Sequence, residues 1–331
     1  MQIICKSEVP PPLITAGETW TDQRCLTKLL EVRPPKDRDS VYRYNDKYGF
    51  SQCLRYAAGL EDATSVYGIL PHGIIPYGRE DRPAIAPSQE ISGKIPCILA
   101  SNDRCIEAFK NAGKTEIFPI GLTSLYAMTC MQREHINGKG SLFFLSHSTP
   151  AFNDSVDDTS VIEWLKQLPS RYQPIRISAF PHDLIRGKYK PYEEAGFRIV
   201  CAGSAYDPKF IWRHLHLIRS HRYILSTGIG THVFHATMCG KPVLIKPTKH
   251  TYKVKKPGFI NYVRAKQYFQ RHASEYHTES QEPKRRQIEI ANLQLGYKYT
   301  LPPKKLRQAL EAAKIVHLQT ANNKQTRQIK Q

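Results

Sequence analysis

The sequence contains no uninterrupted apolar stretch near twenty residues, the length that a helix needs to cross a membrane. Its first twenty residues, MQIICKSEVPPPLITAGETW, hold one early lysine, a short apolar patch and then three prolines. This start lacks the charged and apolar regions of a secretory signal peptide. We therefore expect a soluble, cytoplasmic protein.

Paired cysteines are also missing. The eight cysteines form no C-x-x-C pair and show no repeated spacing, and several, such as Cys201 in RIVCAG, lie in apolar surroundings. This pattern is typical of reduced, buried thiols rather than of disulfides or a structural zinc site. His232 and His235 are three residues apart but lack a third ligand at a usable spacing, so we expect no bound metal. The hydrolase motif G-x-S-x-G is absent as well.

Negative charge is scarce. The 331 residues include 48 Lys and Arg against 29 Asp and Glu, and +14 of the net charge of +19 lies between Lys246 and the C-terminus. Such a surface favours a polyanionic partner (nucleic acid, acidic lipid headgroups or an acidic glycan), although a basic surface also serves solubility alone. The 40% of hydrophobic residues indicate a globular protein, and the length predicts two domains.

Short apolar runs separated by turn residues predict strands that alternate with helices. In the first part of the chain these runs are SVYGIL (65–70), IPCILAS (95–101) and TEIFPIG (115–121). The intervening NDRCIEAFKNAG predicts a helix that Asn102 or Asp103 caps and Gly113 ends.

After residue 138 the alternation begins again and is clearer. Strands are predicted at 141–148, 174–180, 197–203, 222–227 and 241–247, with helices over 157–168, 188–196 and 207–221. Strands connected in this way form a doubly wound parallel sheet. We therefore predict an α/β protein with two Rossmann-like domains, residues 1–138 and 139–331, the second of which ends in a basic helical region.

The segment STGIGTHVFHATMCGKPVLI (226–245) occupies the place where open α/β sheets bind ligands, because a strand precedes it and a helix follows its loop. Gly228 and Gly230 let the backbone approach a ligand, Thr231 can cap the helix, and the helix dipole attracts an anion such as phosphate. A dinucleotide fingerprint would need a third glycine where Val233 stands. The segment therefore predicts phosphate binding without NAD.

The end of this segment, ATMCGKPVLI (236–245), resembles the donor-binding segment of glycosyltransferases of the GT-B fold. LPHG (70–73), IFPIG (117–121) and FLSHSTP (144–150) are similar to other parts of bacterial surface and capsular polysaccharide glycosyltransferases. Many members of the family carry Glu, which holds the ribose, where this chain has His235. The resemblance covers residues 65–247 as a pattern.

The resemblance implies two domains that face each other across a cleft, with a nucleotide-sugar donor bound by the second and a glycan or lipid-linked acceptor bound by the first. It also implies an inverting, metal-independent transfer without a cofactor. The helix KKLRQALEAAKIV (304–316) would cross back to the first domain. The basic C-terminal part would bring the enzyme to the anionic inner face of the cytoplasmic membrane.

The candidate site residues follow from these positions. A histidine or carboxylate near the cleft would deprotonate the acceptor hydroxyl, and His72, His182 and Asp183 are the candidates for catalysis. Hydroxyl groups, an imidazolium and helix N-termini suit the donor phosphates. The predicted donor and nucleotide contacts are His147, Ser148, Thr149, Gly203, Ser204, Gly228, Gly230, Thr231, His232 and His235.

Three other functions use the same features. A polyol-phosphate transferase of the teichoic-acid type would place a CDP-linked donor on the same anion-binding loops. A nucleotide-sugar epimerase of this fold would need more acidic residues in the cleft. A nucleic-acid-binding protein would instead use the basic C-terminal region, with its tyrosines as stacking surfaces.

Overall fold

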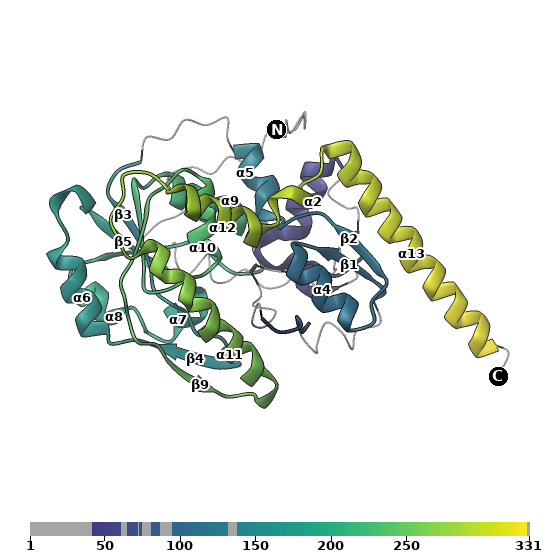
Figure 1. Cartoon of the computed structure of the whole chain (residues 1–331), viewed down its shortest axis with the longest axis horizontal. Coiled ribbons are helices and arrows are strands. Elements are labelled where there is room, and N and C mark those ends of the chain that lie inside the picture. The colour runs from purple at the N-terminus through teal and green to yellow at the C-terminus, as the bar shows by residue number, and fades with distance from the viewer. Residues whose placement is uncertain are drawn as a thin grey trace. The chain divides into compact units, whose positions relative to one another are not determined.

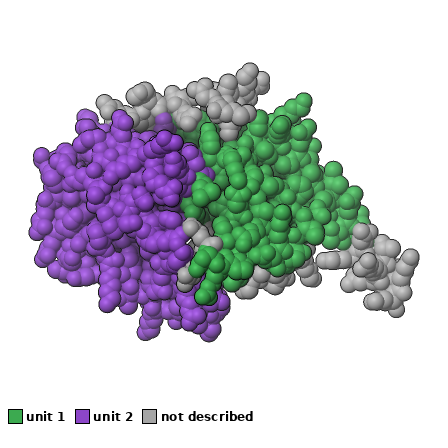
Figure 2. Space-filling view, in the orientation of Figure 1, with its two compact units in different colours: residues 1–11, 34–133, 293–331 green, residues 12–33, 134–292 purple. Residues whose placement is uncertain are grey.

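The computed structural model describes residues 42–60, 65–71, 73, 74, 81–86, 95–131 and 138–329. These residues fall into two compact units (Figure 2). Of the described residues, unit 1 combines those from 42 to 131 with those from 293 to 329, and unit 2 contains those from 138 to 292. The sequence-based division put all of residues 139–331 into one domain, whereas the last 39 residues, 293–331, group with unit 1.

Unit 1 is built around two parallel strands, β1 (Cys97–Ala100) and β2 (Glu116–Pro119). They are joined by α4 (Asp103–Asn111), which Asn102 caps as predicted, since its side chain accepts the N–H of Cys105. The segment 65–70 forms a parallel bridge from Ile69 to Ile98 rather than a regular strand. The remaining elements are η2 (Arg43–Gly49), α2 (Phe50–Ala58), α5 (Ser124–Met131), η6 (Tyr297–Tyr299) and α13 (Pro303–Ile329).

Helix α13, the long yellow helix of Figure 1, packs within unit 1 against α2, β1 and β2. Arg307 donates a hydrogen bond from Nε to the carbonyl of Ala58, and Cys97 donates its thiol to the carbonyl of Ala313. These contacts explain why the C-terminal segment groups with unit 1.

Unit 2 contains a five-stranded parallel sheet: β3 (Ser141–Phe144), β5 (Ile175–Ala179), β6 (Arg198–Cys201), β7 (Tyr223–Ser226) and β8 (Val243–Ile245). The spatial order is β6-β5-β3-β7-β8, so that the first strand is central and the chain winds outward in both directions. This is the doubly wound Rossmann order. The predicted α/β class and all five strands of this sheet are confirmed.

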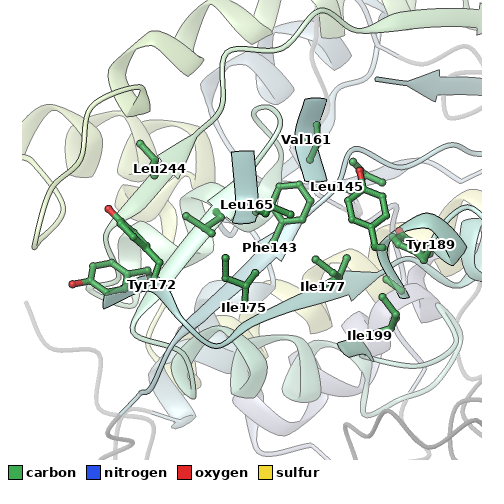
Figure 3. Packing of buried hydrophobic residues seen from close by; sticks show 14 residues of the cluster. Phe143, Leu145, Val161, Leu165, Tyr172, Ile175, Ile177, Tyr189, Ile199 and Leu244 are labelled. Carbon is green, nitrogen blue, oxygen red and sulfur yellow. The ribbon is translucent and has the colours of Figure 1, made fainter. Parts of the chain in front are cut away.

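The helices of this sheet are α6 (Asp158–Gln167), α7 (Pro181–Ile185), α8 (Lys190–Glu194), α9 (Phe210–Arg219) and α10 (Thr231–Met238). Figure 3 shows the core on one face of the sheet, where Phe143 and Ile177 meet Val161 and Leu165 of α6. Val161 and Leu165 are one helical turn apart and fully buried. Burial of each such side chain stabilises the fold by about 1.5–3 kcal/mol.

Beyond the sheet, β4 (Phe152–Ser155) pairs antiparallel with β9 (Thr251–Val254), although about a hundred residues separate them. Figure 1 shows this ribbon beside α11 (Ile260–Phe269), whose Val263 packs with Phe152 in a small core. The chain continues through η4 (Pro257–Phe259), η5 (Gln270–Tyr276) and α12 (Arg285–Leu295). We call β4, β9 and α11 the ribbon module. The sequence patterns did not predict it.

Over the ranges that the structure describes, no helix has both the length and the apolar character needed to span a bilayer; even the 27-residue α13 is too polar. The six cysteines in these ranges are free, and Cys201 is completely buried. Burial raises the pKa of the Cys201 thiol to about 11, so this thiol is unreactive at neutral pH.

Candidate functional site

The carboxyl ends of β5, β3 and β7 lie side by side, because these strands are neighbours in the sheet. The loop after β3 carries His147, Ser148 and Thr149, α7 follows β5, and the loop 227–230 leads from β7 into α10. The fold therefore brings three of the predicted ligand-binding segments to one edge of unit 2. We call it the carboxyl edge.

Helix α10 begins without a side-chain cap. Gly230 is the N-cap and its backbone is extended, whereas the predicted cap, Thr231, is the first residue of the helix. Glycine has no side chain to accept the first amide hydrogens, so an external anion can take the capping position. The helix dipole adds positive potential there.

The loop before α10 is held by one glutamine. The Ile229 N–H donates to Oε1 of Gln270 at 2.7 Å, and Nε2 of Gln270 donates to the Ile229 carbonyl at 3.0 Å. A Cβ atom on Gly228 would lie 2.6 Å from Oε1 of Gln270 and 3.1 Å from Nε2 of His250. Gly228 therefore leaves the space into which the side chains of Gln270 and His250 reach.

His232 lies in the first turn of α10, stacked on Phe144 with 4.4 Å between ring centroids. Its Nε2 is 2.9 Å from Oγ of Ser226, the last residue of β7. Desolvation, and then the neighbouring His214 and His147, hold the pKa of His232 well below 6.5. His232 is therefore neutral at pH 7 and can act on a phosphate as a hydrogen-bond donor, not as a charge.

His147 follows β3 and is exposed on one side, while its ring packs on Phe180 with 4.2 Å between centroids. Desolvation on the packed side and the positive charge of Lys266 lower the pKa of His147. The imidazolium expected from the sequence at this position is therefore replaced by a neutral ring. Positive charge at the edge comes from lysines instead.

The loop after β3 is fixed by buried polar contacts. The N–H of Ser148 donates to Oδ2 of Asp183 at 2.7 Å, and both residues are almost fully buried. Lys188 lies 3.6 Å from the same oxygen and donates to the carbonyls of Ser146 and Asp154. Asp183 was predicted as a catalytic residue, but with its carboxylate buried and bonded in this way it positions the loop.

His182 precedes Asp183 on α7 and is half-buried, with Nε2 3.4 Å from Nη1 of Arg186. Thr149 accepts the N–H of Ala151 with its hydroxyl, at 3.2 Å, and so closes the turn that leads into β4. The other predicted catalytic residue, His72, lies outside the described residues.

Asp154 of β4 is the centre of a buried charge cluster. His250 places Nδ1 2.9 Å from Oδ1 of Asp154 and Nε2 2.8 Å from the carbonyl of Thr227, and Lys266 places Nζ 2.8 Å from Oδ2. Both nitrogens of His250 lie within hydrogen-bond distance of oxygen atoms, so this side chain bridges Asp154 and Thr227. Burial alone would raise the pKa of Asp154, but the His250 hydrogen bond and the Lys266 charge lower it. His250 and Lys266 therefore share one carboxylate.

Acidic residues are missing from one of the segments that build this edge, whereas Asp154 and Asp183 come from the others. No Asp or Glu occurs between Asp207 and Glu275, a stretch that includes the loop before α10, β8, β9 and α11. The same stretch contributes Lys266 and His250 to the site. The local excess of positive charge favours an anionic ligand.

The remaining predicted contacts lie elsewhere. Gly203 and Ser204 follow β6 at the end of the sheet, where the Ser204 hydroxyl accepts the N–H of Tyr206. His235 is 3% exposed, and its Nδ1 lies 3.2 Å from Nε2 of His214 on α9. Its face of α10 is turned to the interior, so His235 is not placed to hold a ribose.

Sequence reasoning missed most of the residues that shape this site: Asp154, Lys188, Ser226, His250, Lys266 and Gln270. The basic excess beyond residue 246 includes Lys266, but it named no residue. Among the side chains that the structure describes, no group of three or more His, Cys, Asp or Glu is arranged to hold a metal ion.

No protein-family model matches this chain, and no curated protein matches it. Among solved structures, the chain is similar to the S. aureus MnaA-UDP co-structure, with 15% sequence identity and a TM-score of 0.39. The similarity covers 78% of this chain and 69% of that chain. The functional argument therefore rests on the chemistry of the carboxyl edge itself.

Proposed function

We propose that this protein is a glycosyltransferase that binds a nucleotide-activated sugar at the carboxyl edge of unit 2 and transfers the sugar to a hydroxyl group of a surface glycan. The observation that carries the proposal is the glycine-capped start of α10, beside a cluster in which Lys266 and His250 share one carboxylate. A diphosphate supplies the negative charge that this arrangement favours.

The chemistry of an inverting transfer suits these groups. As the sugar leaves, negative charge grows on the terminal phosphate of the nucleotide, and stabilisation of that charge is the main task of the protein. The start of α10 and the Lys266 ammonium supply positive potential there, and His232 supplies a neutral hydrogen-bond donor. Removal of the acceptor proton falls to His72 or to His182.

A peripheral position on an anionic membrane fits the surface of the ribbon module. Exposed lysines lie on β9 and in the turn that follows it: Lys253, Lys255 and Lys256. Ile260, at the start of α11, is 42% exposed. Lysines beside an exposed aliphatic side chain match anionic headgroups and the acyl boundary below them.

A ligand panel tests the proposal. The full chain is titrated with UDP, GDP, CMP and CDP while its melting temperature is followed, and single-stranded RNA is tested in parallel over a range of salt concentrations. We expect one nucleoside diphosphate to raise the melting temperature, since a ligand at a hundred times its Kd adds about 2.7 kcal/mol of stability. If no nucleotide shifts the melting temperature and RNA binds in a salt-sensitive way, the protein is a nucleic-acid-binding protein and not an enzyme.

Site specificity needs a matched pair of variants. Lys266→Gln removes the ammonium from the carboxyl edge, whereas Lys253→Gln makes the same charge change on the exposed face of β9. We expect Lys266→Gln to weaken nucleotide binding at least tenfold and Lys253→Gln to leave it unchanged. Product analysis with sugar and polyol conjugates of the nucleotide that binds then separates sugar transfer from polyol-phosphate transfer and from epimerisation.

A further inference from the structure

A second concentration of positive charge lies at the opposite edge of the unit 2 sheet, where β5 and β6 begin. A cavity of about 450 Å³ opens there. This volume is within the range of small-molecule binding sites. We call it the amino-edge cavity; its lining includes Lys166, Pro174, Arg176, Gly196, Phe197 and Arg198.

Two of the lining arginines are direct neighbours. Arg176 of β5 and Arg198 of β6 are paired in the register of these parallel strands, so both side chains leave the sheet on the same face. Like charges at such opposed positions destabilise a sheet. Within the described part of the chain, no ion pair joins either guanidinium, or the ammonium of Lys166, to a carboxylate.

The surroundings of Arg176 add no counter-charge. His221, at the end of α9, is 1% exposed. Burial, followed by the positive charges of Arg176 and Lys241, lowers the pKa of His221 to about 4. Its imidazole is therefore neutral at pH 7 and adds no charge beside Arg176.

We propose that the amino-edge cavity is a second binding site, for a small anionic molecule that carries a phosphate or carboxylate group. Guanidinium groups form paired hydrogen bonds with both kinds of oxyanion, and two adjacent arginines with Lys166 supply up to three positive charges. Phe197 and Pro174 supply an apolar wall for the carbon skeleton of the ligand. Binding removes the repulsion between Arg176 and Arg198.

The site is tested by calorimetric titration of the full chain at low salt with three probes: inorganic phosphate, glucose 6-phosphate and glucuronate. We expect at least one probe to bind the wild type, and the double variant Arg176→Gln/Arg198→Gln to bind it at least tenfold more weakly. Binding of glucose 6-phosphate without glucuronate identifies a phosphate ligand, and the reverse identifies a carboxylate. Failure of all three probes to bind the wild type overturns the proposal.

Two controls separate this site from general charge and from the carboxyl edge. Lys110→Gln/Lys305→Gln removes two exposed positive charges from unit 1 and should leave probe binding unchanged. Lys266→Gln alters the carboxyl edge and should also leave it unchanged. The proposal is wrong if the lysine pair weakens binding as much as the arginine pair does, or if only Lys266→Gln abolishes it.

The single variant Arg198→Gln tests the repulsion directly and without a ligand. Arg198 is exposed, so its replacement leaves no buried gap. We expect its melting temperature to rise by about 1–3 °C, because opposed like charges cost a fraction of a kcal/mol. A lower melting temperature would show that the arginines are already compensated, which contradicts the proposed site.

Discussion

The imidazole of His250 bonds the carboxylate of Asp154, with 2.9 Å between Nδ1 and Oδ1. Its other nitrogen lies 2.8 Å from the carbonyl of Thr227, in the loop before α10. One side chain therefore links the buried charge of the ribbon module to the loop that we propose binds phosphate. Substitutions in the ribbon module should therefore alter the affinity for the ligand, through this contact and through Gln270.

Removal of the shared carboxylate tests the stability of the cluster. Asp154→Asn leaves the ammonium of Lys266 without its buried counter-ion, and loss of one partner from a buried pair costs about 3–5 kcal/mol. We expect urea unfolding to show a loss of this size. The exposed variant Glu163→Gln on α6 should stay within about 0.5 kcal/mol of the wild type. A similar, small change for both variants would show that the cluster contributes little.

Gln270 offers a test of loop positioning. Gln270→Ala removes both hydrogen bonds to Ile229, so the loop before α10 loses its anchor while the fold remains. We expect about tenfold weaker nucleotide binding and a loss of stability of about 1–3 kcal/mol. Gln267→Ala, an exposed position on the same side of the module, is the control. Equal nucleotide affinity in the two variants would show that Gln270 does not contribute to nucleotide binding.

The requirement for glycine at position 228 can be measured with one methyl group. Gly228→Ala brings a Cβ to 2.6 Å from Oε1 of Gln270, so the glutamine must shift and release the loop. We expect nucleotide binding to weaken by about tenfold, which corresponds to about 1.4 kcal/mol. Gly258→Ala adds the same methyl group where no atom lies within 4 Å, and should bind as the wild type does.

Buried neutral histidines predict acid sensitivity. The pKa of His214 and that of His221 are each lowered from 6.5 to about 4, with desolvation as the first cause. The unfolded chain takes up these protons first, so the stability is fully present above pH 6.5 and is lost as the pH falls toward 4. For His221 the loss amounts to about 3 kcal/mol. Melting curves between pH 7.5 and 4.5 measure it, and His221→Gln should show a shallower decline.

Kinetics separate the proposed base from the binding residues. We expect His72→Ala to abolish turnover while nucleotide affinity stays close to that of the wild type, because a base acts on the acceptor and not on the nucleotide. His182→Ala is compared in the same assay, since it is the other candidate. A variant that keeps the wild-type rate shows that the histidine it lacks is not the base.

Much of the sheet of unit 2 was predictable because β3, β7 and β8 are buried on both faces and therefore read as continuous apolar runs, such as SLFF at 141–144. Strands β4 and β9 gave no such signal. Their sequences, FNDS and TYKV, are short and half-polar, and the partner of each is about a hundred residues away. Local patterns carry no information about pairing at that distance.

As with the fold, one part of the candidate site was predictable from the sequence and another part was not. The loop of Gly228 and Gly230 follows a strand, so its place at the carboxyl edge came from the topology alone. His250 and Lys266 were visible only as basic residues, because their roles depend on Asp154, which reaches them through the β4–β9 pairing. His235 was assigned by analogy with Glu in related enzymes, but its side of α10 faces the interior.

The grouping of residues 293–331 with unit 1 has a consequence for synthesis of the chain. A ribosome makes the α2 segment before residues 134–292, but its partner helix α13 only after them. The surface of unit 1 that α13 covers therefore stays exposed to solvent while residues 134–292 are translated. A nascent chain of this protein needs protection from aggregation mainly in the half that was made first.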